Sequence, residues 1–409
     1  MNAILSRYAH IAGNQALVFE SITSLLAEKA NRVDWASLHS EDWALFQKMA
    51  IAEGVAAMLY YRLAGEPEIY NSSRFDPATY QHFAQHEART AITNAVYFNH
   101  LNQVLTMLNE HNIATVLLKG AHLAKSIYPT PALRPMSDLD ILVREQDFKQ
   151  ALEIVNALGY HQYLPEVLPD FNRFLSHHAH LKKDGPIGVI LELHWILVAT
   201  PAYRHAAPMD WFWQNTEPNQ AWKKANPSTN TDYIFNLNPT ANLLYLSAHQ
   251  MLQHGGDQVT LRWLLDLHFL IRQEYAAIDW QALSAQAAIF QWDSALKESL
   301  QMVNRIFGTP LPVDFVDNLA ITAGKFDSLV KSKGSHSPSR ILAEGRIIGS
   351  LNWPGRIRAV LALVFPSPAY MRWRYRPNPP WIWPFMYLYR WFDIAGDATR
   401  TIIVKLQNR

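Results

Sequence analysis

Two aspartates separated by a single residue carry the clearest chemical signal in this sequence. Asp138 and Asp140 begin the run Asp-Leu-Asp-Ile-Leu-Val of residues 138–143, whose alternation is typical of a half-buried strand. Residues i and i+2 of a strand point to the same face, so both carboxylates share a face while the apolar residues enter a core. Because like charges repel at this distance, such a pair is usually relieved by a cation. Oxygen ligands without a nearby thiolate favour Mg²⁺ or Mn²⁺ over zinc.

A third carboxylate, Glu192, lies in the run Val-Ile-Leu-Glu-Leu-His-Trp of residues 189–195. If this strand lies beside the strand of Asp138 and Asp140, we expect the three carboxylates to converge on one metal-binding patch. His194 shares the face of Glu192, and its plainer interpretation is a packed, hydrogen-bonded core histidine.

A candidate phosphate-binding turn precedes the aspartates. Lys119, Gly120 and Ala121 join a predicted strand to a predicted helix, where a glycine lets backbone N–H groups approach an anion at the helix N-terminus. Lys119 and Arg134 supply positive charge that could neutralise a polyphosphate. The chain contains neither the Walker P-loop pattern nor the Rossmann glycine pattern.

The segments around these residues alternate between strand and helix. Apolar runs, helical periodicity, proline breaks and the turn Lys-Asp-Gly-Pro at 183–186 mark their limits. We predict strands over 113–118, 138–143, 178–183 and 188–197, and helices over 121–128 and 146–158. This order indicates an α/β or α+β unit of about 90 residues.

Changes of pattern along the chain divide it into four regions. Residues 1–110 have helical periodicity, and residues 111–200 contain the α/β core. Residues 201–325 form a helical domain, although its first part, up to residue 240, is expected to be mostly loop because five prolines interrupt it. Asp266 is expected to cap or pair within that domain, and the alternative is a role near the nucleotide. Residues 326–409 combine a polar linker with a basic, aromatic C-terminal region.

The motifs, taken in order, resemble the DNA polymerase β-like nucleotidyltransferase superfamily. More narrowly, they are similar to the uncharacterised bacterial nucleotidyltransferase family. The resemblance covers about residues 90 to 310, and residues 365–366 and 372–376 show a weaker similarity. The matching motifs are Leu117–Ala121, Tyr128-Pro129, Arg134–Val143, Leu191–Trp195 and Leu261–Asp266.

The resemblance implies an α+β fold in which a small mixed sheet is flanked by largely helical N- and C-terminal regions. It implies two divalent ions, held by Asp138, Asp140 and Glu192, that stabilise the entering and leaving oxygens of an in-line displacement at phosphorus. Glu192 would also take part in activating the acceptor hydroxyl. Binding of a nucleotide such as ATP is implied for Lys119, Gly120, Ala121, Arg134 and Ser137.

Two positions depart from the superfamily pattern. Gly120 is followed by alanine where the superfamily often has serine or a second glycine, so backbone, Lys119 or Arg134 must hold the triphosphate. The third carboxylate is glutamate rather than aspartate and is one methylene longer.

Several histidines have plainer interpretations. His177, His178 and His180 form a short tract, and alternation places the last two together, but we find no carboxylate spaced to complete a zinc set. His249 and His254 are five residues apart and do not share a helical face well, which favours a structural role.

The overall composition excludes several classes of protein. The 409 residues include 36 Lys and Arg against 35 Asp and Glu, so bulk charge does not suit a nucleic-acid coat. The absence of cysteine excludes disulfides, thiolate metal sites and cysteine nucleophiles, and fits the cytoplasm. We find no signal peptide and no apolar run long enough to span a bilayer, so we expect a cytoplasmic protein that is soluble or peripheral.

The C-terminal region differs in charge from the rest of the chain. From Arg340 onward, eleven basic and three acidic residues interleave with five tryptophans. Three interpretations stay open: the aromatic residues pack against the helices, residues 340–409 contact the inner membrane surface, or they bind a polyanion.

Our first hypothesis is a Mg²⁺-dependent nucleotidyltransferase that moves an NMP from an NTP donor to an acceptor and releases pyrophosphate. The acceptor is open among a protein, a metabolite, a sugar or lipid intermediate, and RNA. The second is a non-catalytic nucleotide-binding or adaptor module that docks through its C-terminal tail; three retained carboxylates argue against it and the Gly-Ala turn argues for it. A metal-dependent phosphohydrolase is disfavoured because the carboxylates have no histidine ligand set at suitable spacing.

Overall fold

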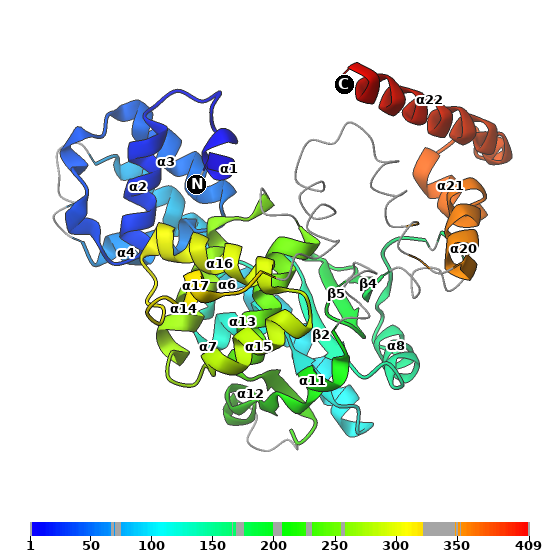
Figure 1. Ribbon diagram of the computed structural model, residues 1–409, viewed down its shortest axis with the longest axis horizontal. Coiled ribbons are helices and arrows are strands. Elements are labelled where there is room, and N and C mark those ends of the chain that lie inside the picture. Colours follow the sequence, from blue (N-terminus) through cyan, green and yellow to red (C-terminus); the bar gives the residue numbers. More distant parts are fainter. Residues whose placement is uncertain are drawn as a thin grey trace.

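The protein is built around one seven-stranded mixed sheet with the strand order β3-β4-β5-β2-β1-β7-β6 (Figure 1). The computed structural model describes residues 2–66, 69, 75–165, 167–168, 176–198, 207–225, 231–254, 258–321, 348, 351 and 353–407. The strands are β1 (Thr115–Leu117), β2 (Leu139–Val143), β3 (His161–Gln162), β4 (His178–Lys183), β5 (Val189–His194), β6 (Thr216–Pro218) and β7 (Ile234–Leu237). The predicted α+β class with a mixed sheet and helical flanks is confirmed.

Two parallel pairings make the sheet mixed. Strand β2 pairs in parallel with β5, and β1 pairs in parallel with β7. The pairs β1–β2, β3–β4, β4–β5 and β6–β7 are antiparallel. The four strands predicted from the sequence are β1, β2, β4 and β5, and they form a continuous part of the sheet in the order β4-β5-β2-β1.

The N-terminal region is helical, as its periodicity predicts. Its longest helix begins after Asp76, whose side chain accepts a hydrogen bond from the backbone N–H of Ala78 and so caps the helix. The helices are α1 (Asn2–Ser6), α2 (Gln15–Leu26), η1 (Ala30–Arg32), η2 (Trp35–Ser37), α3 (Ser40–Ala52), α4 (Ala56–Ala64) and α6 (Pro77–Glu110).

One face of the sheet packs against α6 and against α8 (Phe148–Ala157). The alternating residues of β2, Leu139, Ile141 and Val143, enter this core, as their period of two predicts. They meet apolar side chains of α6 such as Leu101 and Leu105. The residues between them must therefore point to the opposite face of the sheet.

The opposite face meets α7 (Lys119–Ser126) and the helical domain. Val116 of β1 and Leu142 of β2 belong to a core that also contains Leu244 of α13 and Leu264 of α14. The helical segments are η3 (Pro131–Leu133), α13 (Pro239–Ala248), the π-helix η4 (His249–Gln253), α14 (Leu261–Glu274), α15 (Trp280–Ile289), α16 (Asp293–Phe307) and α17 (Phe315–Asn318). Helices thus cover both faces, and polar groups of the second face are enclosed.

The prediction that residues 201–240 are mostly loop is wrong for much of this segment. It contains α11 (Met209–Gln214), β6, α12 (Gln220–Ala225) and β7. Strand β6 ends on Pro218 and lies at the edge of the sheet, where a proline does not interrupt a ladder of hydrogen bonds. The prolines therefore separate short elements instead of marking a continuous loop.

The C-terminal region forms a separate group of helices. These are α20 (Trp353–Val364), α21 (Pro368–Tyr375), η6 (Pro380–Phe385) and α22 (Met386–Gln407), and Figure 1 shows them on the opposite side of the molecule from α1–α4. Ala359 and Ala362 of α20 pack with Val167 and Leu168 in a small cluster. The predicted polar linker at 331–339 lies outside the described residues. Among the described residues, no helix is both long and apolar enough to cross a membrane.

Candidate active site

The register between β2 and β5 brings the predicted carboxylates together. Asp140 lies directly beside Glu192 in the parallel pairing of these strands, and Asp138 immediately precedes β2. The expectation that the two strands are neighbours is confirmed by this register. Since both side chains point away from the α6–α8 core, their carboxylates occupy the enclosed face of the sheet.

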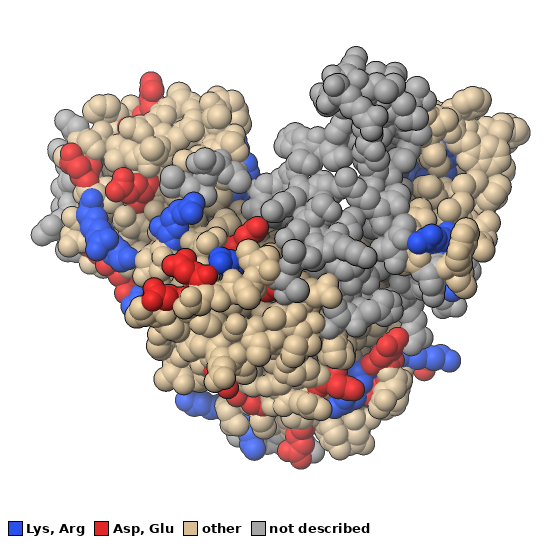
Figure 2. All heavy atoms as spheres, viewed as in Figure 1, with Lys and Arg blue, Asp and Glu red and all other residues tan. Residues whose placement is uncertain are grey.

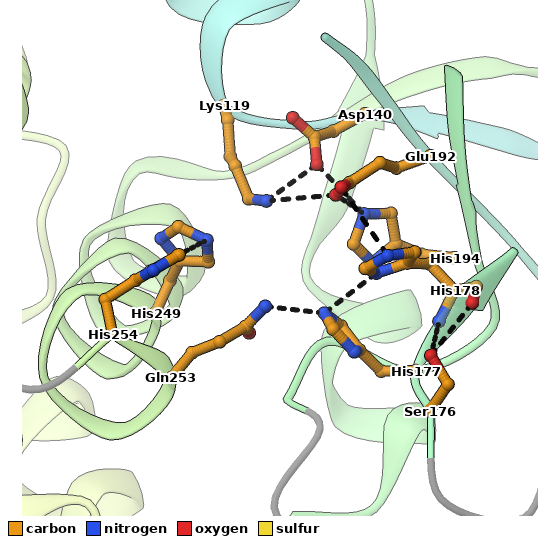
Figure 3. Close-up of polar contacts among 10 residues, drawn as sticks. All are labelled: Lys119, Asp140, Ser176, His177, His178, Glu192, His194, His249, Gln253 and His254. Atoms are coloured by element: carbon orange, nitrogen blue, oxygen red, sulfur yellow. Dashed lines mark hydrogen bonds and ion pairs between the residues drawn. The ribbon is translucent and has the colours of Figure 1, made fainter. Parts of the chain in front are cut away.

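Lys119 lies between these two carboxylates (Figure 3). Its Nζ is 2.6 Å from Oδ1 of Asp140 and 3.8 Å from Oε2 of Glu192. The residue has a positive φ of 41°, at the point where the chain leaves β1 and begins α7. Its side chain is 13% exposed, so the ion pair is largely shielded from water. In this structure the Lys119 ammonium supplies the cation that two neighbouring carboxylates require.

His194 completes this cluster from β5. Its Nε2 lies 2.9 Å from Oδ1 of Asp140 and 3.4 Å from Oε2 of Glu192, and its side chain is fully buried. The interpretation of His194 as a hydrogen-bonded core histidine therefore describes its contacts. However, its partners are two of the predicted metal ligands, so the ring also fixes the positions of their oxygens.

Burial and neighbouring charge act in opposite directions on the carboxyl groups. Burial alone would raise the pKa of Asp140, but the Lys119 ammonium and the His194 hydrogen bond hold it below its ordinary value. Burial likewise opposes ionisation of Glu192, whose pKa is nevertheless held well below its usual range by the His194 hydrogen bond and nearby positive charge. Burial and the Asp140 carboxylate raise the pKa of Asp138 to about 6. Asp138 is thus the carboxyl group whose ionisation burial and neighbouring carboxylates disfavour, since Lys119 and Arg134 offset these effects only in part.

The donor set fits divalent cations. Asp140 and Glu192 provide hard oxygen ligands on the enclosed face, and Asp138 is near enough for their charges to raise its pKa. Asp140, Glu192 and His194 also offer one ligand atom each within 4.8 Å of one another. Groups of acidic and histidine side chains that could hold a metal are therefore present, and the chemistry of their donors is compatible with more than one kind of ion.

The predicted phosphate-binding turn is the start of α7. No side chain caps this helix, whose N-cap is Leu118, so the first-turn N–H groups are not bound by a capping residue. Gly120 and Ala121 are both buried, and a Cβ on Gly120 would overlap Nη1 of Arg134. Glycine is therefore required here for the close approach of a side chain. Ser137 is exposed, and its carbonyl accepts a hydrogen bond from the Tyr97 hydroxyl.

Arg134 is held by a buried aspartate. Its Nη2 and Nε donate to the two carboxylate oxygens of Asp266 at 2.7 and 3.1 Å, and the Tyr128 hydroxyl donates to the same carboxylate at 2.8 Å. Nη1 donates to the Pro135 carbonyl at 3.3 Å. The expectation that Asp266 pairs within the helical domain is wrong, since its partners lie between α7 and β2. All three guanidinium nitrogens of Arg134 have protein partners.

The structure overturns the argument that the histidine tract lacks a carboxylate. His180 lies directly opposite Glu192 in the antiparallel pairing of β4 with β5, and His178 lies opposite His194. His178, His180 and Glu192 offer ligand atoms within 4.8 Å of one another, as do His177, His178 and His194. Sequence spacing could not reveal these groups because the pairing of two strands creates them.

The π-helix η4 faces this cluster from the helical domain (Figure 3). Gln253 donates from Nε2 to Nε2 of His177 at 2.7 Å. The prediction that His249 and His254 do not share a face is wrong: their Nε2 atoms are 3.2 Å apart, because a π-helical turn brings residues i and i+5 together. Burial and the Lys119 charge lower the pKa of His249. Gln253 was missed as a residue of this cluster, since a local π-turn has no clear signal in the sequence.

Asp140 on β2, Glu192 on β5 and the Lys119-Gly120 start of α7 are the motifs that resemble nucleotidyltransferases in the sequence, and the fold brings them to one face of the sheet. A family model described as an uncharacterised nucleotidyltransferase matches residues 39–308. The chain belongs to this family, and its membership supports nucleotide transfer in general. Comparison with curated proteins and with solved structures finds no match.

Proposed function

We propose that this protein is a Mg²⁺-dependent nucleotidyltransferase that moves an NMP from an NTP to an acceptor and releases pyrophosphate. The observation that carries the proposal is the parallel register of β2 and β5, which sets Asp140 beside Glu192 with Asp138 two residues before it. Asp138, Asp140 and Glu192 would hold Mg²⁺ or Mn²⁺. When bound, these ions neutralise phosphate charge and stabilise the entering and leaving oxygens.

The chain's own residues divide the remaining work. An acceptor hydroxyl gives up its proton to water, its oxygen forms a bond to the α-phosphorus as the bond from that phosphorus to the β-phosphate oxygen breaks, and pyrophosphate leaves. Lys119 and the N–H groups of Gly120 and Ala121, in the uncapped first turn of α7, would meet phosphate oxygens, and the exposed Ser137 would lie at the rim. The low pKa of Glu192 suits a permanently ionised ligand better than a proton acceptor. Because Arg134 is hydrogen-bonded to Asp266, it would support the turn at Gly120 instead of contacting phosphate directly.

The test is binding of ATP, GTP, CTP and UTP, each with and without Mg²⁺, measured by calorimetry and thermal shift. The wild type is compared with Asp138→Asn/Asp140→Asn and with Asp210→Asn, an exposed aspartate of α11 that serves as the matched control. Metal-dependent stabilisation by an NTP, lost only in the double variant, is expected. Transfer is then followed with an α-phosphate-labelled NTP.

The alternative is a non-catalytic module that binds nucleotide or a partner. One observation favours it: the Lys119 ammonium lies 2.6 Å from Oδ1 of Asp140 and so neutralises one of the proposed metal ligands. In that case no NTP response would depend on Mg²⁺, and the double variant would behave like the Asp210 control. This result would contradict the transferase proposal.

We also propose that the C-terminal helices dock on an anionic bilayer surface. Of the 21 exposed large hydrophobic side chains among the described residues, 12 lie between 353 and 392. Trp353, Trp381 and Phe392 are 73%, 70% and 77% exposed. Arginines such as Arg356 and Arg372 accompany them, and Figure 2 shows a largely uncharged surface with basic points over this region. Exposed aromatic residues with arginine match the interface of an anionic membrane.

Vesicle sedimentation tests this contact. Trp353→Ser/Trp381→Ser/Phe392→Ser should abolish binding to phosphatidylglycerol vesicles, whereas Ile92→Ser/Ile289→Ser/Val313→Ser removes equally exposed side chains elsewhere and should not. Wild-type binding should weaken with salt and be smaller on neutral phosphatidylcholine. If the wild type sediments with neither kind of vesicle, the proposal is wrong. The inner-membrane and cytoplasmic location predicted from the sequence stays a prediction.

A further inference from the structure

A second, chemically different group of donors lies beside the carboxylates. The antiparallel pairing of β4 with β5 sets His180 opposite Glu192, and His178 lies two residues before it on the same face. Nε2 of His178 is 3.5 Å from Oε1 of Glu192. The residues His178, His180 and Glu192 are all partly exposed.

The two oxygens of Glu192 face different neighbours. Oε2 faces Lys119 at 3.8 Å and His194 at 3.4 Å, which is the side of Asp140. Oε1 faces His178 on the other side. The Glu192 carboxylate therefore separates a group of oxygen donors from a group of nitrogen donors, and it contributes one oxygen to each.

Nε2 of His178 is directed at Glu192 and lies 3.5 Å from its Oε1. The other ring nitrogen, Nδ1, lies 3.0 Å from Nε2 of His177, which is itself 2.7 Å from the Gln253 amide nitrogen. Nδ1 of His178 is therefore engaged by the protein, and Nε2 is the ring nitrogen that a cation beside the Glu192 carboxylate can use.

His180 supplies a third possible metal-ligand atom, its Nε2. Its Nε2 is buried and makes no hydrogen bond within the part of the chain that the structure describes. The ring stacks on Tyr163, with centroids 5.1 Å apart, which holds its orientation. Fixed rings and an outer hydrogen-bonded partner, here His177 with Gln253, are the usual surroundings of histidine metal ligands.

We propose that His178, His180 and Oε1 of Glu192 bind a borderline transition-metal ion of the Zn²⁺ type. Two imidazoles and one carboxylate suit such an ion better than Mg²⁺. Three protein ligands leave a position for water or for a ligand of the ion. This site is distinct from the carboxylate site of the proposed transferase and does not rest on that function. Because Glu192 belongs to both, occupation of one site alters the other.

The experiment uses Zn²⁺ in calorimetry and Co²⁺ in visible absorption, on full-length protein without a polyhistidine tag and without nucleotide. Excess Mg²⁺ occupies the oxygen donors throughout. One equivalent of Co²⁺ should bind and give the absorption of a nitrogen-ligated, low-coordinate ion. His180→Gln should weaken Zn²⁺ binding at least tenfold and remove that absorption, whereas Asp138→Asn should retain both.

Two further variants separate ligation from folding. His161→Gln changes a 56% exposed histidine on the adjacent strand β3 and should bind Zn²⁺ as the wild type does. His180→Asp restores a donor and should recover binding relative to His180→Gln. Unchanged Zn²⁺ affinity in His180→Gln, or no binding by the wild type, would overturn the proposal. An absent Mg²⁺–NTP response would refute only the transferase proposal, since this measurement contains no nucleotide.

Discussion

Two buried groups of charges lie at the N-terminal turn of α7 and differ in how their charges are balanced. Arg134 and Asp266 form a bidentate pair that the Tyr128 hydroxyl joins, so every charged oxygen has a donor. The other group sets Lys119 and His194 against Asp138, Asp140 and Glu192. The first group is closed and holds the chain in place. The second has more carboxylates than cations and so keeps the capacity to bind one.

The largest effect on the free energy of unfolding should come from removing one charge of the buried Arg134–Asp266 pair. Asp266→Asn leaves a buried arginine without its counter-ion and should lower the free energy of unfolding by about 3–5 kcal/mol in urea titration. Asp210→Asn on the surface should change it by less than about 0.5 kcal/mol. The double variant Arg134→Met/Asp266→Leu should recover much of the loss, because no unpaired charge remains. A loss below about 1 kcal/mol in Asp266→Asn would contradict a structural role.

The next effect concerns activity and rests on the proposed transferase. Asp138→Asn should lower the rate of transfer from an NTP by about a hundredfold to a thousandfold, equivalent to about 3–4 kcal/mol. The far-ultraviolet circular dichroism spectrum should not change, since no side-chain hydrogen bond in the described structure ends on Asp138. Equal transfer rates for the variant and the wild type would show that Asp138 has no role in the transfer reaction.

Although Asp138→Asn should lower the transfer rate, it should raise the free energy of unfolding of the metal-free protein. The pKa of Asp138 is about 6 in the folded chain against an ordinary value of 3.8, so between these values the folded state binds more protons than the unfolded state. The wild type therefore loses stability as pH rises from about 4 to about 6. With a chelator present, Asp138→Asn should gain about 2–3 kcal/mol at pH 8 and nothing below pH 4. A gain that does not vary with pH would show that charge is not its cause.

The smallest effect should come from an exposed ion pair, which is neither buried nor surrounded by surplus carboxylates. Arg272 lies 3.2 Å from Glu28, and both side chains are more than 40% exposed. Arg272→Ala should change the unfolding free energy by less than about 1 kcal/mol, and added salt should reduce the difference further. A change as large as that of Asp266→Asn would show that burial does not explain the contrast.

Much of the central fold could be predicted from local pattern. The period-two runs predict β2, β4 and β5, and helical periodicity predicts the regions before and after the sheet. Strands β6 and β7 were missed because they are only three and four residues long and lie among prolines. Such short strands take their stability from the strands beside them, and a local pattern holds little information about that pairing.

Alternation along a strand is a property of the backbone, so the order of residues was enough to assign Asp140, Glu192, His178 and His180 to a face of their strands. Which of these residues meet depends on how the strands are paired in the folded protein. The register of β2, β4 and β5 set His180 and Asp140 on either side of Glu192. Sheet register and the π-turn of η4 depend on contacts between distant segments, and no run of neighbouring residues specifies such contacts.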